Sequence, residues 1–322
     1  MRKPSILRRP GRWDWDPLHA LRVGVQTLVR ALVRLWGRDV MLFTGGVSFF
    51  VMLAIFPALA ILVGLYGLLA DPAQAAQEGE ALSRLMPLGA RDIFRNELLR
   101  LTTTPHASVS TQSLLALLIG VYAAHRGFKA LLAGLSFIHD EDKPRGFVGF
   151  NVLALAVLVA TFCAIGLVSA VFLGLRVMGS AFELRPLRGV SWLYSEWTWA
   201  SAALSVGLTF IYRFAMSSRP VDWRASAVGG VTAAALCLGA SWAIAFYVEG
   251  VAHLGATYGS IATVIVFLIW LSWNVNAIFF GGALATEVEL QLEAMSIHDR
   301  PLMLNDVRGS KPLVWPPRDR LR

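Results

Sequence analysis

The sequence predicts an all-α membrane protein: a bundle of about six transmembrane helices with an N-terminal amphipathic helix and short external helices. The composition supports this class, because 56% of the 322 residues are hydrophobic, only 16% are charged and the mean hydropathy is +0.59. Soluble domains are roughly half apolar and about a quarter charged. The apolar residues also form blocks of about eighteen or more, which is long enough to cross the hydrocarbon core. Within each block the apolarity is continuous rather than alternating, which favours helices over barrel strands.

Six apolar blocks define the predicted spans. They cover residues 41–70, 113–137, 147–175, 190–214, 225–248 and 260–287. The membrane domain is therefore predicted at 41–287, between a basic cytoplasmic segment at 1–40 and a polar cytoplasmic tail at 288–322. Residues 71–112 are predicted to form an external segment with one or two amphipathic helices. The first block is too long for the apolar part of a signal peptide and too far from the start of the chain, so we expect a retained span.

The basic residues predict the orientation of the chain. With the N-terminus in the cytoplasm, 22 of the 29 Lys and Arg residues lie on the cytoplasmic side, and seven lie outside. The cytoplasmic groups lie in residues 2–38, 126–145, 213–224 and 300–322. Because positive charge near the ends of spans is retained in the cytoplasm, both termini are predicted to be cytoplasmic, in a bacterial inner membrane.

The N-terminal segment has the pattern of an amphipathic helix over residues 18–38. One face would hold Leu21, Val25, Leu28, Leu32 and Trp36, and the other Arg22, Arg30, Arg34 and Arg38. Such a helix is attracted to a membrane surface with anionic headgroups. A cytoplasmic helix docked against the spans fits the same pattern equally well. Nucleic acid is not expected as a partner, because arginines beside a first span are accounted for by topology.

Several short sequences resemble the YihY/BrkB family of bacterial inner-membrane proteins. They are residues 43–50 (FTGGVSFF), 53–57 (LAIFP), 257–260 (TYGS) and 268–270 (LIW), together with Arg219-Pro220, Trp223-Arg224 and Gly229-Gly230. The resemblance runs in order over roughly residues 39–289. It implies the multi-span architecture rather than a reaction, since members have carried a ribonuclease label and a virulence label without a shared activity. Where the family pattern has Gly-Ala-Glu near the end of the last span, this chain has Gly281-Gly282-Ala283, so no acidic role is carried over.

The charges inside the second predicted span are the main candidates for a substrate site. Arg126 and Lys129 are three residues apart, so they share one helical face, and His125 is adjacent. Charges within a span usually face a protein interior or a water-filled cavity, which predicts a cationic site for an anionic group such as a lipid headgroup. The alternative is that both long side chains extend toward the cytoplasmic surface.

Two further groups of residues are candidates for gating. Gly45, Gly46 and Pro57 interrupt the first span, and broken helices line substrate sites in some transporters; a tilted helix with a proline kink explains the same residues. Tyr258 and Gly259 are predicted at the outer end of the last span. There a tyrosine anchors at the headgroups and a glycine turns the chain. Their match to the family pattern also suggests an outer gate.

No enzymatic motif is present in the sequence. It has no phosphate-binding loop with a following Lys-Ser or Lys-Thr, no HExxH and no GxSxG. The two cysteines lack metal-ligand or disulfide spacing. The polar residues 139–142 are expected to form a cytoplasmic turn. We therefore predict no catalytic residue, metal or cofactor, and a ribonuclease is not favoured.

These observations favour a transporter or lipid-translocating protein for an anionic or amphipathic substrate. The alternative is a non-transporting scaffold of the cell envelope, or a virulence-associated membrane protein, that acts through residues 71–112 and the basic termini. Loss of charge at Arg126 separates these functions, because only the first requires an anion site there.

Overall fold

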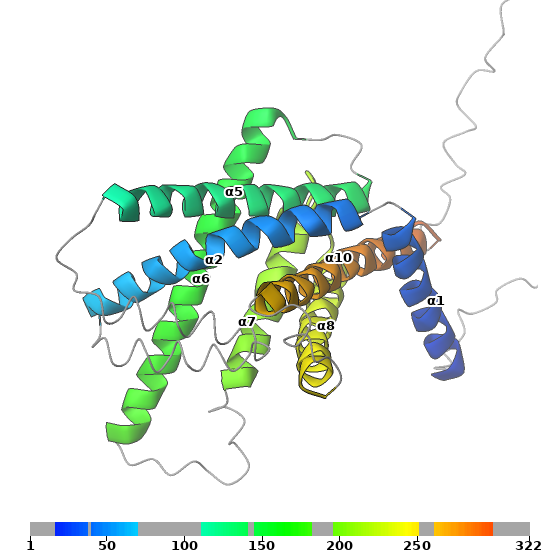
Figure 1. The fold of residues 1–322 in the computed structure, drawn as a ribbon. Helices are drawn as coiled ribbons and strands as arrows, with labels where there is room; N and C mark the ends of the chain where they lie inside the picture. The colour runs from blue at the N-terminus through cyan, green and yellow to red at the C-terminus, as the bar shows by residue number, and fades with distance from the viewer. Residues whose placement is uncertain are drawn as a thin grey trace, which may run out of the picture. The chain divides into compact units, whose positions relative to one another are not determined.

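The computed structural model describes residues 17–37, 40–69, 111–140, 145–181, 196–250 and 261–298. Within these ranges the chain forms helices and no strand (Figure 1). The helices are α1 (Pro17–Trp36), α2 (Met41–Leu69), α5 (Thr111–His139), α6 (Phe147–Ala181), α7 (Glu196–Phe214), α8 (Trp223–Gly250) and α10 (Ile261–His298). The chain divides into two units, Met1–Glu289 and Leu290–Arg322, and the contacts described below lie within the first.

Each of the six apolar blocks corresponds to one helix, α2, α5, α6, α7, α8 and α10, and the predicted all-α class is confirmed. In the described part of the chain, three segments are long and apolar enough to cross a membrane: Phe147–Val168, Trp223–Tyr247 and Val264–Met295. The count becomes four if α1 and the start of α2, bent by 76°, form one broken span. Six crossings therefore remain a prediction.

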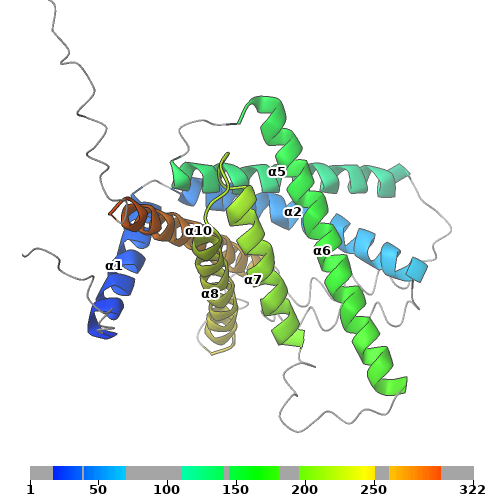
Figure 2. The ribbon, with the colours of Figure 1, turned by 180° about the vertical axis from the view of Figure 1, so that it is seen from behind.

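Two helix pairs make the most extensive contacts. Helix α2 packs along α5, and α7 packs along α8, whereas α6 contacts α5 and α7 over shorter stretches. Figures 1 and 2 show both pairs side by side from opposite directions. The α2–α5 contact passes over Gly120, where an added Cβ would lie 2.1 Å from Cβ and Cγ of Pro57. Only glycine accommodates the proline ring at this point.

Small residues bring α8 and α10 into backbone contact. A Cβ added to Gly229 would lie 2.5 Å from the carbonyl oxygen of Gly281, and one added to Gly230 would lie 2.3 Å from Oγ1 of Thr209 on α7. Such distances leave no space for a side chain at either glycine, so both are required for this close helix packing. In lipid, this kind of contact supplies the dispersion energy that holds helices together.

Polar side chains connect α10 to its neighbours. Thr44 on α2 donates to Oδ1 of Asn276 over 3.0 Å, and the indole nitrogen of Trp270 donates to Ser241 on α8 over 2.9 Å. In a medium that offers no water, these bonds satisfy groups that lipid would leave unpaired.

Some sequence predictions differ from the structure or lie outside its described part. Helix α2 runs without a break through Gly45, Gly46 and Pro57, so the structure shows no broken first helix. Helix α10 continues to His298 rather than ending at residue 287, because polar residues beyond 287 are compatible with a helix that extends past the bilayer. The external segment at 71–110, most of the C-terminal tail, Tyr258 and Gly259 lie outside the described residues.

Candidate functional site

The three predicted cations of α5 do not form one cluster in the structure. Nζ of Lys129 donates to Oδ1 of Asn151 on α6 over 2.7 Å, and Nε2 of His125 lies 3.3 Å from the backbone oxygen of the same residue. Arg126 instead approaches α2, with its guanidinium 5.6 Å from the ring centre of Phe50. Lys129 and His125 thus share a polar partner, and Arg126 is directed to a different neighbour.

The contact of Lys129 places it near the beginning of α6. Asn151 is only four residues into that helix, about 6 Å from its start at 1.5 Å per residue, and Lys129 also lies 5.6 Å from the ring centre of Phe147, the first residue of α6. The N-terminal end of α6 is predicted to be cytoplasmic. Lys129 therefore extends toward the start of α6 and is half-buried there beside a specific partner.

We expect Asn151→Leu to destabilise the protein. Lys129 is charged, so loss of its hydrogen-bond partner should lower the free energy of unfolding by about 1.5 kcal/mol, the lower end for a charged donor because the group is only half-buried. Unfolding in mixed detergent micelles measures this. Lys129→Met/Asn151→Leu is the control, because removal of both groups should recover most of the loss. A double variant as unstable as the sum of both single variants would contradict the bond.

Arg126 is exposed on the surface of α5, so within the described part of the chain it does not face the protein interior that the sequence predicts for a charge inside a span. Its side chain lies against Tyr122, at 5.9 Å from the ring centre, as well as against Phe50. Stacking of a guanidinium on aromatic rings is a favourable electrostatic contact that leaves its N–H donors free for an anion. Among the described residues, no carboxylate lies within ion-pair distance of this guanidinium.

A second polar cluster forms where the ends of α1 and α5 meet α10. Both Nε and Nη2 of Arg34 lie 2.7 Å from Oε1 of Glu287. Nη1 of Arg34 donates to Oδ2 of Asp140 over 3.1 Å and to the backbone oxygen of Ile138 over 3.2 Å. The Arg34 and Glu287 side chains are only 15% and 10% exposed, whereas that of Asp140 is 56% exposed. Arg34 thus fixes α1 to α5 and α10 through a nearly buried ion pair.

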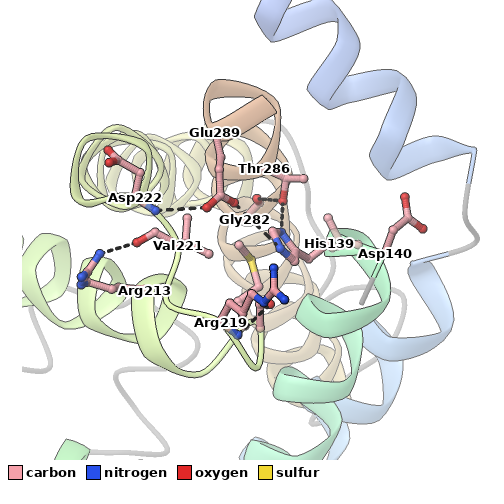
Figure 3. Close-up of polar contacts among 12 residues, drawn as sticks. His139, Asp140, Arg213, Arg219, Val221, Asp222, Gly282, Thr286 and Glu289 are labelled. Carbon is pink, nitrogen blue, oxygen red and sulfur yellow. Dashed lines mark hydrogen bonds and ion pairs between the residues drawn. The ribbon is translucent and has the colours of Figure 1, made fainter. Parts of the chain in front are cut away.

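The same region includes a second set of contacts, drawn in Figure 3. Nδ1 of His139 lies 3.1 Å from Oγ1 of Thr286, which donates to the oxygen of Gly282. Nε2 of His139 lies 3.8 Å from Glu289, whose other oxygen accepts from the backbone N–H of Asp222 over 3.1 Å. Glu289 therefore connects the end of α5 with the start of α8. In the described ranges, no group of three or more His, Cys, Asp or Glu residues is arranged to hold a metal ion.

Two arginines donate hydrogen bonds to backbone carbonyl oxygens near the end of α7 and in the connection to α8. Arg145 donates to the carbonyl oxygens of Ala215 and Phe214 over 3.0 and 3.2 Å, and also to that of Ser217. Arg213 donates to the oxygen of Val221, and its guanidinium lies 4.2 Å from the Trp223 ring. Carbonyls at a helix C-terminus have no partner within the helix, so Arg145 satisfies those of α7 and opposes the negative end of its dipole. Arg213 instead bonds the connection that leads to α8.

Sequence reasoning missed Arg34 and Glu287 as partners. The sequence pattern puts Arg34 on a polar face with three other arginines, and it marks Glu287 only as the end of the last predicted span. The available signal was the position of Glu287, the first carboxylate after a run of uncharged residues that begins at Ser260. An ionisable group at the end of such a run usually has a partner within the protein.

Comparison with known proteins agrees with this architecture. The family model described as Virulence factor BrkB matches residues 31–301. A UPF0761 membrane protein of Paraburkholderia xenovorans (strain LB400) is 37% identical over 79 residues, a match that covers 24% of this chain and 18% of that protein. No solved structure matches the chain. Because the family model covers most of the chain, including the helices α2 to α10 and the residues around Arg34 and Glu287, this membrane protein belongs to the Virulence factor BrkB family.

Proposed function

We propose that this protein moves an anionic amphipathic substrate, such as a phospholipid, across the bacterial inner membrane. In this proposal the anionic headgroup binds at Arg126 while the apolar part of the substrate stays in lipid. The chain acts by binding and movement, and no catalytic step is assigned to it.

The observation that carries the proposal is the position of Arg126 on an exposed apolar stripe. Leu115, Ile119 and Tyr122 are exposed on α5, and Arg126 continues their spacing of four, three and four residues. Residues at this spacing lie along one face of a helix. A helix face of exposed large apolar residues within a membrane protein is suited to contact with lipid. Arg126 therefore brings a positive charge to a surface that acyl chains can reach.

The energetics favour an anionic partner at this position. A cation on a lipid-facing surface is costly unless it reaches the interface or an opposite charge. Arg126 lies thirteen residues before the end of α5, about 20 Å along the helix, and its guanidinium rests on Phe50 and Tyr122. A phosphate headgroup would supply the counter-charge that the described residues do not provide, through the bidentate hydrogen bonds that arginine makes with phosphate.

The contacts at the helix ends support the proposed topology. The end of α5 and the start of α8 meet α10 through His139, Glu289 and Asp222, and Arg145 before α6 caps the end of α7. These are the parts of the chain with the predicted cytoplasmic arginines and lysines. An up-and-down arrangement with both termini in the cytoplasm accounts for both observations.

A translocation assay tests the proposal. Purified protein is reconstituted in liposomes with fluorescent phosphatidylglycerol or phosphatidylcholine, and the fraction of label accessible to dithionite is followed over time. We expect wild-type protein to move phosphatidylglycerol, and Arg126→Ala to slow this at least about tenfold, equivalent to about 1.4 kcal/mol. Arg126→Lys should retain part of the rate, because the charge remains.

The matched control is Arg219→Ala, which removes an exposed arginine from the loop before α8 and should leave the rate unchanged. Equal rates for wild type and Arg126→Ala would contradict a role for this residue. An absence of movement of either lipid by folded wild-type protein, also with an imposed ion gradient, would favour the cell-envelope scaffold instead.

A further inference from the structure

Helix α1 presents an apolar face away from the helices on which it is docked. Its exposed large hydrophobic residues are Val23, Val25, Leu28, Val29, Leu32, Val33 and Trp36. Val25, Val29, Leu32 and Trp36 follow one another at spacings of four, three and four residues and so form a single stripe. Trp36, at its end, is 74% exposed. An exposed apolar stripe of this kind indicates a surface that is covered by lipid or by another protein.

The opposite face of α1 is the one that contacts the protein. Thr27 and Ala31 are buried there, and Arg34 makes its nearly buried ion pair with Glu287 from the same side. The sequence left two alternatives open for this helix, a membrane surface or docking against the spans. The structure supplies the docking contacts and leaves the apolar face free for a different contact.

The direction of α1 relative to α2 suggests what covers that face. The residues of α1 from Arg22 to Trp36 are bent by 76° from the first part of α2, Met41–Ile55, across a short connection. Because α2 is one of the predicted spans, a helix nearly perpendicular to its first part is expected to lie close to the plane of the membrane. Helix α1 also ends at Trp36, and tryptophan side chains favour the headgroup region of a membrane.

We infer that the exposed face of α1 inserts into the cytoplasmic leaflet and that its arginines bind anionic lipid there. Arg22 and Arg30 are exposed on α1, beside the apolar stripe, which is the arrangement found in helices that lie in an anionic membrane interface. The contact between Arg34 and Glu287 holds this helix in place on the bundle. The inference is independent of the proposed translocation at Arg126.

Fluorescence at two adjacent positions tests the inference in the full-length protein. Cys163→Ser/Cys237→Ala provides a background without cysteine, and Val29→Cys or Arg30→Cys is labelled with an environment-sensitive dye. In liposomes with phosphatidylglycerol, we expect the probe at position 29 to be quenched several-fold more by doxyl-labelled lipid than the probe at position 30. Aqueous iodide should give the reverse order.

The lipid charge provides the second readout. Quenching at position 29 should increase with the fraction of phosphatidylglycerol, and Arg22→Gln/Arg30→Gln should remove that dependence. Equal access of iodide to both positions would overturn the inference, because the face would then lie in water. Protection from both quenchers that increases with the protein-to-lipid ratio would also overturn it, since a second copy of the chain would then cover the face.

Discussion

Replacement of Glu287 by alanine is expected to lower the free energy of unfolding by about 3 kcal/mol. The change leaves the nearly buried guanidinium of Arg34 without its main counter-charge, and loss of one partner of a buried ion pair typically costs about 3–5 kcal/mol. The lower end applies because Arg34 retains its bonds to Asp140 and to the oxygen of Ile138. Unfolding in mixed detergent micelles provides the measurement.

Asp140→Asn is the matched control, because it removes the charge of the other carboxylate on the same arginine and keeps a residue type that tolerates the positive φ of 57° at this position. The Asp140 side chain is 56% exposed, so loss of its charge should cost less than about 1 kcal/mol. A double-mutant cycle of Arg34→Ala and Glu287→Ala should give a coupling energy well above the error of the measurement. Strict additivity of the two substitutions would show that the pair does not stabilise the docking of α1.

Replacement of Gly281 by alanine is expected to destabilise the bundle by about 3 kcal/mol, the upper end for an overpacked interior. An added Cβ would lie 2.6 Å from Cβ of Ala233, 2.7 Å from the oxygen of Gly229 and 2.8 Å from the hydroxyl of Tyr212. The first two atoms belong to backbone or to a side chain without freedom to rotate. Helices α8 and α10 must therefore move apart to accommodate the methyl group.

Gly239→Ala serves as the control for this prediction. It lies on α8, and an added Cβ there would meet nothing within 4 Å. Since alanine favours a helix by up to about 1 kcal/mol over glycine, this variant should be as stable as wild type or slightly more stable. Similar losses for both variants would mean that glycine at 281 is required for a reason other than helix contact.

The sequence was sufficient to predict the helices but not how they face one another. Length and continuous apolarity indicate a span, and this placed α2, α5 and α8 within two residues of their observed bounds. In a helix that is apolar on all sides, however, no alternation of apolar and polar residues shows which face is buried against the other helices. The close approach of Gly281 to Gly229, and of Pro57 to Gly120, depends on tertiary packing that no local pattern encodes.

For the candidate site, too, the sequence predicted which residues are unusual but not which neighbours they contact. The sequence identified His125, Arg126 and Lys129 as unusual because ionisable residues within an apolar block are rare. It placed Arg126 and Lys129 on one face, whereas the structure directs Lys129 to Asn151 on α6 and Arg126 to Phe50 on α2. Long side chains on one helical face can diverge to different neighbours, and those neighbours follow from the fold. The pairing of Arg34 with Glu287 joins residues 253 positions apart, which sequence spacing cannot reveal.

The most direct test of the proposed function is lipid crosslinking beside Arg126. A photoreactive p-benzoylphenylalanine replaces Tyr122, the exposed residue whose ring lies against the Arg126 guanidinium. After illumination in liposomes of equal phosphatidylglycerol and phosphatidylcholine, mass spectrometry identifies the adducts. The proposal predicts adducts enriched in phosphatidylglycerol, with the enrichment lost in Arg126→Gln. Adducts formed only with protein, or with both lipids equally in wild type, would contradict an anionic headgroup site at Arg126.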